Sequence, residues 1–75
     1  MTRFYFHLTD GTMIEDDQGQ PCATEKEARA HADQVARELS RNRARDDIKH
    51  WAVCVTDESG KRITRIPLAR HPRRQ

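Results

Sequence analysis

The residues best suited to chemistry lie mostly in one early segment, which has the sequence FYFHLTDG over residues 4–11. There His7 could serve as an acid–base group and Tyr5 as a proton donor, with the distant Cys54 as a nucleophile. Such catalysis needs a nucleophile, a base and an orienting group at fixed relative positions. Nothing in the spacing imposes that arrangement. We therefore predict that no residue is catalytic and that the protein is not an enzyme.

Metal-binding residue types are present, but not at the spacing of known sites. The chain has four histidines and two cysteines, yet contains neither CxxC nor HxxxH. The segment EDDQG at 15–19 lacks the alternating oxygen ligands of a calcium loop. We expect no metal site and no cofactor. Cys22 and Cys54 are predicted to be free thiols, because a disulfide scaffold of this size usually carries four or more cysteines.

Length and composition indicate one small domain. A chain of 75 residues buries only about 60% of its unfolded surface, so every large apolar side chain matters. Fourteen basic and 12 acidic residues give a net charge of +2, and so a weak overall field. The N-terminus does not resemble a signal peptide, and no segment is apolar enough to span a membrane. We predict a cytoplasmic protein with a domain over residues 1–69 and a basic, flexible tail over 70–75.

The first half of the chain predicts a hairpin. Residues 3–8 alternate between apolar and polar side chains, which is typical of a half-buried strand. Asp10-Gly11 favours a tight turn, and a second strand is expected over Met13–Asp16. A three-residue loop would place Ile14 opposite Leu8 on the buried face, so we predict that register.

One helix is predicted in the middle of the chain. Thr24 and Glu27 match a capping box, which marks the helix start. The apolar positions fall on one stripe, and nothing in the sequence ends the helix before about Arg45. The stripe consists of Ala28, Ala32, Val35 and Leu39, flanked by His31 and Ala36.

The second half of the chain predicts another hairpin. Residues 50–57 place Trp51, Val53 and Val55 on one face of a strand, and a turn follows over 57–60. In the next strand, near 62–68, the alternation of apolar and polar residues is interrupted. Either a bulge lies near Thr64 or Ile63 faces the other side of the sheet. Pro67 places this strand at an edge. The expected fold is α+β: a two-layer ββαββ domain with a four-stranded, mainly antiparallel sheet and one long helix on one face.

A single helix covers only one face of a four-stranded sheet, which leaves the other face open. That face would carry Tyr5, His7, Ala52 and Cys54, and exposed apolar patches of this kind mark interaction surfaces. Edge strands of small sheets also favour pairing of two copies. We therefore predict a small interaction module that works as a homodimer or binds another cellular protein.

Nucleic-acid binding is the alternative function. Basic side chains on the helix and in the tail could contact phosphates, although the helix carries nearly as many acidic residues. A solvated, ion-paired helix face is the commoner explanation of such a pattern. The candidate contacts are Arg37, Arg41, Arg45, Arg70, Arg73 and Arg74.

Several segments together resemble a known group of proteins. They are FYFHLTDG, DDQG at 16–19, TEKEAR at the helix start, VCVTDESG at 53–60 and IPL at 66–68. In this order they resemble a family of short bacterial, mainly alphaproteobacterial, proteins that open with a Tyr/Phe-rich F-H-L-x-D-G strand. That family is a domain of unknown function, so the resemblance implies an architecture and no activity. Thr64-Arg65 departs from the apolar pattern usual there, which leaves the register of the last strand open.

Overall fold

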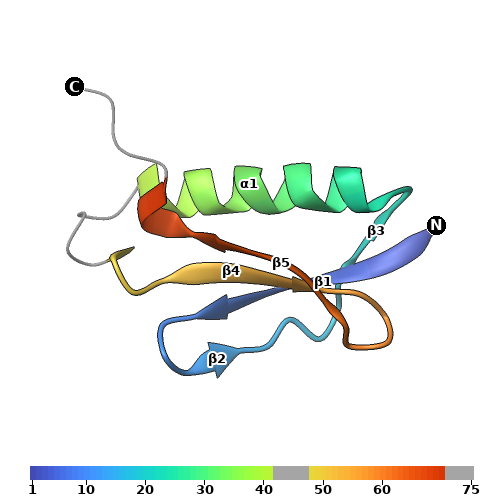
Figure 1. The fold of residues 1–75 in the computed structure, drawn as a ribbon, viewed down its shortest axis with the longest axis horizontal. Helices are drawn as coiled ribbons and strands as arrows, with labels where there is room; N and C mark the ends of the chain where they lie inside the picture. The colour runs from blue at the N-terminus through green and yellow to red at the C-terminus, as the bar shows by residue number, and fades with distance from the viewer. Residues whose placement is uncertain (42–47, 71–75) are drawn as a thin grey trace.

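The computed structural model describes residues 1–41 and 48–70, which form an antiparallel sheet with one helix packed across it (Figure 1). The predicted α+β class is confirmed. Along the chain the elements are β1 (Thr2–Thr9), β2 (Met13–Ile14), β3 (Gln20–Cys22), α1 (Glu25–Arg41), β4 (Ala52–Thr56), β5 (Arg62–Pro67) and the 3-10 helix η1 (Leu68–Arg70). Within those ranges, no helix combines the length and apolar character that crossing a bilayer requires.

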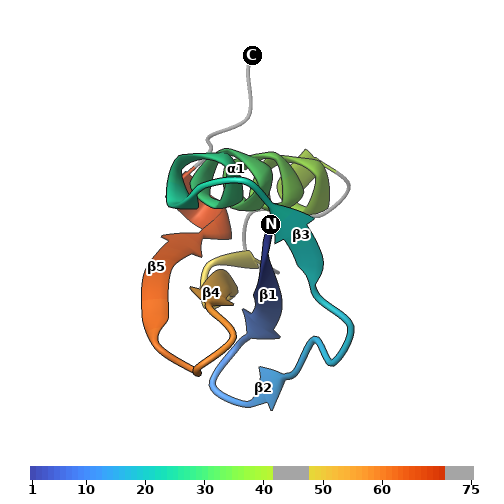
Figure 2. The ribbon, with the colours of Figure 1, turned by 90° about the vertical axis from the view of Figure 1, so that its right-hand side faces the viewer.

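The sheet has one strand more than the sequence predicts. Its main path runs β2-β1-β4-β5, and β3 pairs with the N-terminal part of β1 (Figure 2). The extra strand β3 is short, and its central residue, Pro21, lies opposite Arg3. Proline cannot donate to a ladder, which is why this segment is not expected to be a strand.

The β1–β2 hairpin has the predicted register. Leu8 lies opposite Ile14 and Thr9 opposite Met13, so the loop has three residues. Gly11 at its centre has φ of 108°, a backbone conformation that other residues rarely adopt. The expectation that Ile14 is buried is wrong, since 55% of its surface is exposed. The strand pairing is right, but the helix does not extend over this edge of the sheet.

The predicted capping box forms at the start of α1. The Glu27 N–H donates to Thr24 Oγ1 at 3.1 Å, and Ala28 N–H donates to the Thr24 carbonyl. Glu27 Oε1 accepts from the N–H of Ala23 at 2.9 Å, one residue earlier than in the usual capping box. The helix is described as far as Arg41, and its predicted continuation to about residue 45 lies outside the described residues.

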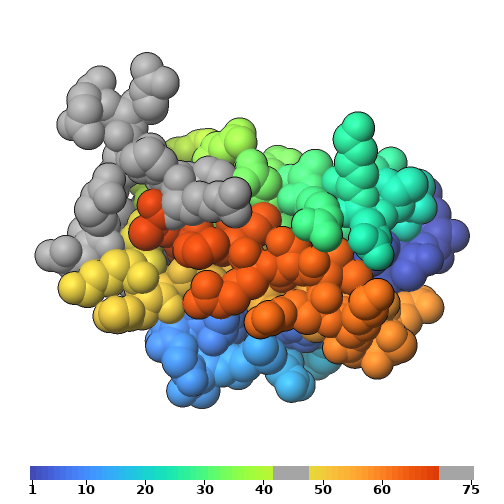
Figure 3. Space-filling model, in the orientation of Figure 1, coloured from blue at the N-terminus to red at the C-terminus, as the bar shows by residue number. Residues whose placement is uncertain are grey.

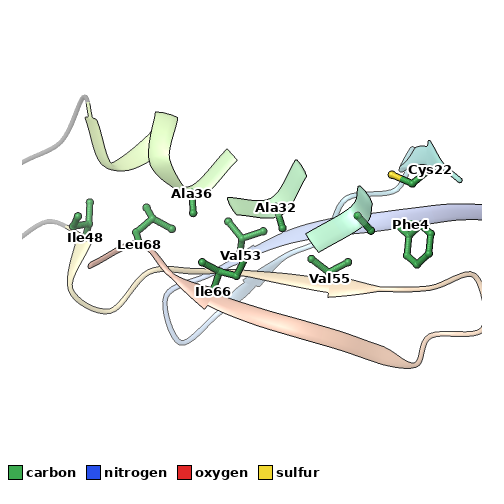
Figure 4. Close-up of a cluster of buried hydrophobic side chains, with 10 residues drawn as sticks. Phe4, Cys22, Ala32, Ala36, Ile48, Val53, Val55, Ile66 and Leu68 are labelled. Carbon is green, nitrogen blue, oxygen red and sulfur yellow. The ribbon is translucent and has the colours of Figure 1, made fainter. Parts of the chain in front are cut away.

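The core lies between α1 and the central strands. Ala28, Ala32 and Ala36 are fully buried on the helix. Ala32 and Ala36 face Val53 and other residues of the sheet (Figure 4). Their small side chains let the helix backbone approach the sheet closely. Val35 and Leu39, which are predicted to belong to the same stripe, are only partly buried.

A bulge explains the change of phase in β5. Thr56 lies opposite Arg62, whereas Val55 lies opposite Thr64, so Ile63 is the extra residue. Of the two alternatives left open by the sequence, the bulge is the one that forms. Ile63 packs against the core, and β5 crosses the molecule below the helix (Figure 3).

The outer side of β5 offers few backbone donors. The Leu68 N–H donates to the Trp51 carbonyl at 2.9 Å. Because every second residue of a strand directs its N–H and C=O toward the same neighbour, this bond shows which residues of β5 direct theirs toward β4. Arg65 and Pro67 therefore point theirs outward, and proline has no N–H. Over residues 64–67 the outward edge has a single donor, the Arg65 N–H. The prediction that Pro67 lies on an edge strand is confirmed.

Candidate functional site

The sheet face opposite the helix carries the four residues predicted to form an interaction surface. Tyr5 and His7 are half-buried there, whereas Ala52 and Cys54 are only 0% and 6% exposed. The latter two are small side chains on β4, which lies between β1 and β5, so larger neighbours on both sides cover them. The expectation that Ala52 and Cys54 are exposed is therefore wrong.

Both ring nitrogens of His7 are engaged within the chain. The Asp16 N–H donates to Nδ1 at 3.0 Å, and Nε2 lies 3.0 Å from Thr56 Oγ1 on β4. Because a backbone N–H can only donate, Nδ1 is the unprotonated nitrogen, and the neutral ring donates from Nε2 to Thr56. A general base needs a free nitrogen within reach of its substrate. In this arrangement His7 connects β1 to the segment after β2 and to β4, and it has no free nitrogen that could act as a general base.

The Asp16 carboxylate fills a gap in the sheet edge between β2 and β3. Its Oδ2 accepts from the Phe6 N–H, and its Oδ1 accepts from the N–H groups of Gln18 and Gly19, each at 3.1 Å. Partial burial acts to raise the pKa of this carboxyl, but the three N–H donors outweigh it and lower the pKa, and His7 acts in the same direction when its ring is charged. The charged side chain thus replaces the missing strand partner of Phe6.

The same face holds Tyr5 in a fixed position. Its ring lies nearly parallel to that of His7, with an interplanar angle of 9° and centroids 6.4 Å apart. Near its Cε2 edge lies Gly19, where an added Cβ would come within 3.0 Å of the Tyr5 ring and 2.7 Å of Arg3 Cγ. Gly19 also has φ of 72°, so both the close approach and the backbone conformation require glycine.

A second partly exposed surface lies on the helix side of the sheet, along β1 and β2. The helix packs over β4, β5 and η1, and β2 lies farthest from it (Figure 2). Apolar side chains that this arrangement leaves partly or largely exposed form what we name the β1–β2 flank: Phe6, Leu8, Ile14, Val35, Leu39 and Trp51. Ile14 is the most exposed of them.

The α1 and β1 residues of the β1–β2 flank follow one another in the same order, because α1 and β1 run in the same direction (Figure 1). The rings of His31 and Phe6 meet edge to face with centroids 4.7 Å apart. The four residues from His31 to Val35 advance about 6 Å and the two from Phe6 to Leu8 about 6.8 Å, so Val35 comes level with Leu8. Leu8 in turn pairs with Ile14. The strip therefore extends from the helix across β1 to the edge of the sheet.

Comparison with known proteins gives a family for this arrangement. Residues 3–69 match the family described as domain of unknown function DUF6894. The chain belongs to that family. No curated protein and no solved structure matches it. The prediction of a domain-of-unknown-function family is confirmed, and membership assigns no activity to the DUF6894 domain.

Two of the six arginines predicted to contact nucleic acid have described side chains in this DUF6894 domain. Arg37 and Arg41 are both exposed on α1, and Arg37 forms an ion pair with Asp33, with Nη2 3.0 Å from Oδ2. Arg70 lies in η1, but its side chain is not described. The pair with Asp33 offsets part of the positive charge expected on the helix. Outside the described residues lie Arg45, Arg73 and Arg74.

Among residues 1–41 and 48–70, the cysteines and acidic side chains of the DUF6894 domain show no arrangement that would make a reactive centre. Cys22 and Cys54 are buried free thiols. Burial raises the pKa of the Cys22 thiol, and the negative charge of Glu27 acts in the same direction, which disfavours the reactive thiolate. In the part of the chain that the structure describes, no three His, Cys, Asp or Glu side chains come together as a possible metal site.

Sequence reasoning missed Asp16 and Thr56, the two partners of His7. A local signal for Asp16 does exist, since an aspartate three residues before a glycine is typical of a turn closed by the carboxylate. Its contact with His7 depends on how the segment after β2 passes along β1. The partnership with Thr56 depends on the pairing of β1 with β4, 49 residues apart in sequence. No local pattern carries that information.

Proposed function

We propose that this DUF6894 domain is a small, non-catalytic interaction module that pairs with a second copy of itself through the β1–β2 flank. The observation that carries the proposal is the exposure of apolar side chains on one side of a chain that has few of them, with Ile14 55% exposed. Contiguous apolar strips on small proteins mark interaction surfaces. The engagement of both His7 nitrogens supports a role without catalysis.

A second copy is the proposed occupant because the core of a single chain is small. Ala28, Ala32, Ala36 and Ala52 are among its fully buried residues, and alanine contributes little apolar surface. A domain of this length has a thin stability margin, which pairing of two flanks would widen. A two-fold arrangement uses the same strip on both copies, so one patch is sufficient for both sides of the interface.

The sheet edges support pairing through side chains rather than through backbone strands. One edge consists of β2 and β3, with two and three residues, and β3 contains Pro21. The other edge, β5, has few outward donors and ends at Pro67. Short strands and proline are the usual means of preventing edge-to-edge addition. The apolar strip is then the surface that supports association.

Sedimentation of the full chain with two matched variants tests the proposal. Ile14 and Met13 are neighbours on β2, 55% and 46% exposed, and they point to opposite faces of the sheet. Ile14→Asp would bury a carboxylate twice in a two-fold interface and should raise the dimer Kd about 100-fold or more. Met13→Asp should leave the dimer intact. A wild-type chain that is monomeric at high micromolar concentration, or equal effects of both variants, would contradict the proposal.

A further inference from the structure

The sheet face opposite the helix combines aromatic and positively charged side chains in neighbouring rows. Strand register places Tyr5, Thr56 and Arg62 in one row across β1, β4 and β5. The next row contains His7, Cys54 and Arg65. Each aromatic side chain is thus about 10 Å from an arginine, with one small residue between them. This face differs in character from the apolar β1–β2 flank on the other side of the sheet.

Two arginines of this face are available to a ligand, whereas the guanidinium of a third, Arg3, donates to the Gln18 carbonyl at 2.7 Å. Arg62 and Arg65 are both exposed, and neither has an ion pair among the residues that the structure describes. Because they lie opposite Thr56 and Cys54, which are two residues apart on β4, their positions along the strand differ by about 7 Å. That spacing resembles the separation of successive phosphates in an extended single strand. The helix arginine Arg37 differs, since it is paired with Asp33.

Tyr5 provides a preorganised stacking surface beside these arginines. Its ring is half-buried and nearly parallel to the His7 ring, and its Cε2 edge lies close to Gly19. His7 cannot rotate freely, since Asp16 and Thr56 hold both of its nitrogens. A ring that is already fixed loses little conformational freedom when a base stacks against it.

We propose that this face binds single-stranded nucleic acid, with a base stacked on Tyr5 and successive phosphates held by Arg62 and Arg65. Exposed aromatics on a sheet next to basic side chains are the usual elements of such sites. An acidic peptide would satisfy the arginines but would make no use of the partly exposed Tyr5 ring. The proposal assigns nucleic-acid contact to the sheet face and not to the helix arginines, and it does not depend on dimerisation.

Fluorescence anisotropy with labelled single-stranded RNA and DNA of about 12 nucleotides tests this site. The full chain should bind at low salt, and two phosphate contacts predict a slope of about −1.4 for log K against log salt concentration. The double variant Arg62→Ala/Arg65→Ala should lose at least tenfold in affinity, whereas Arg37→Ala should stay within twofold. Tyr5→Leu should weaken binding about five- to 150-fold, while Tyr5→Phe keeps the ring and should bind like the wild type.

Several results would contradict the proposal that this face binds single-stranded nucleic acid. They are an absence of binding at about 50 mM salt, affinity unchanged by the double arginine variant, and displacement of the oligonucleotide by polyglutamate at equal charge concentration. Loss of binding only when residues 71–75 are removed would place the contact in the tail and would equally contradict the proposal. Thermal melts by circular dichroism separate loss of binding from loss of fold. Ile14→Asp should retain binding, so failure of the dimer proposal is distinguishable from failure of this one.

Discussion

The two halves of the sheet are held in place by different interactions. Under the helix, Val53 and Val55 of β4 are fully buried against the alanine stripe of α1. Beside it, the β1–β2 half is fastened by hydrogen bonds of His7 and Asp16, while Ile14 stays exposed. Phe4 of β1 also belongs to the core, so a chain too short to cover a whole sheet can stabilise the sheet by apolar packing under the helix and add polar contacts toward the β2 edge. The apolar surface left over is then available to a partner.

The largest expected difference between the halves is in the cost of removing an apolar side chain. Leu68 is 1% exposed beneath the helix end, and Leu68→Ala should lower the free energy of unfolding by about 2–5 kcal/mol. Ile14→Ala, in the other half, should change it by less than about 0.5 kcal/mol when measured at concentrations too low for association. Urea denaturation gives both values. Equal losses would show that the β1–β2 half is packed as tightly as the other.

The close approach of the helix to the β4–β5 half should appear as intolerance of larger side chains. Ala32 is fully buried against the sheet, so Ala32→Leu should destabilise the fold by about 1–3 kcal/mol through overpacking. Ala30 is exposed on the same helix, and Ala30→Leu should be nearly neutral. Thermal melts of the two variants provide the comparison. A neutral Ala32→Leu variant would mean that space remains between the layers.

The stability of the β1–β2 half of the sheet should depend more on pH than that of the β4–β5 half. Asp16 has a lowered pKa in the folded chain, so its contribution to stability is complete above its ordinary value of about 3.9 and is lost as the pH falls through the lowered value. Asp16→Asn would place an amide N–H group against one of the N–H donors and should cost about 1–3 kcal/mol at neutral pH.

Hydrogen exchange followed by residue can locate that effect. In Asp16→Asn, and in the wild type at acid pH, protection should fall first around β2 and the segment up to Gly19, with β4 and β5 affected less. Wild type and variant should also converge in stability as the pH falls below the folded pKa of Asp16. A uniform loss of protection across the sheet would contradict the division into two differently stabilised halves.

Local sequence signals were sufficient for the elements and for much of the pairing. The capping box at Thr24, the three-residue loop after Thr9 and the bulge alternative near Thr64 each depend on a few neighbouring residues, and each agrees with the structure. These features follow from backbone geometry and side-chain alternation, which act over short distances.

The candidate sites were harder to predict, because they depend on how layers overlap. One helix leaves one sheet face uncovered, which predicts that Ala52 and Cys54 are exposed, but their neighbours across the ladder shield them. The pairing with Leu8 predicts that Ile14 is buried, but α1 lies over the other half of the sheet. Alternation determines which face a side chain points to, and only the position of the helix determines whether that face is covered.

The two edges of the sheet are poor sites for adding a further strand, and this affects how the protein behaves at high concentration. Arg29 Nη2 donates to the Ile63 carbonyl at 3.2 Å, so even the bulged residue of β5 has its outward acceptor occupied by the helix. With Pro67 on the same margin and Pro21 on the other, neither side is a template for fibrillar growth. Assemblies of this chain should therefore have a fixed, small stoichiometry. At high protein concentration, that assembly should become more populated without amyloid-like polymerisation.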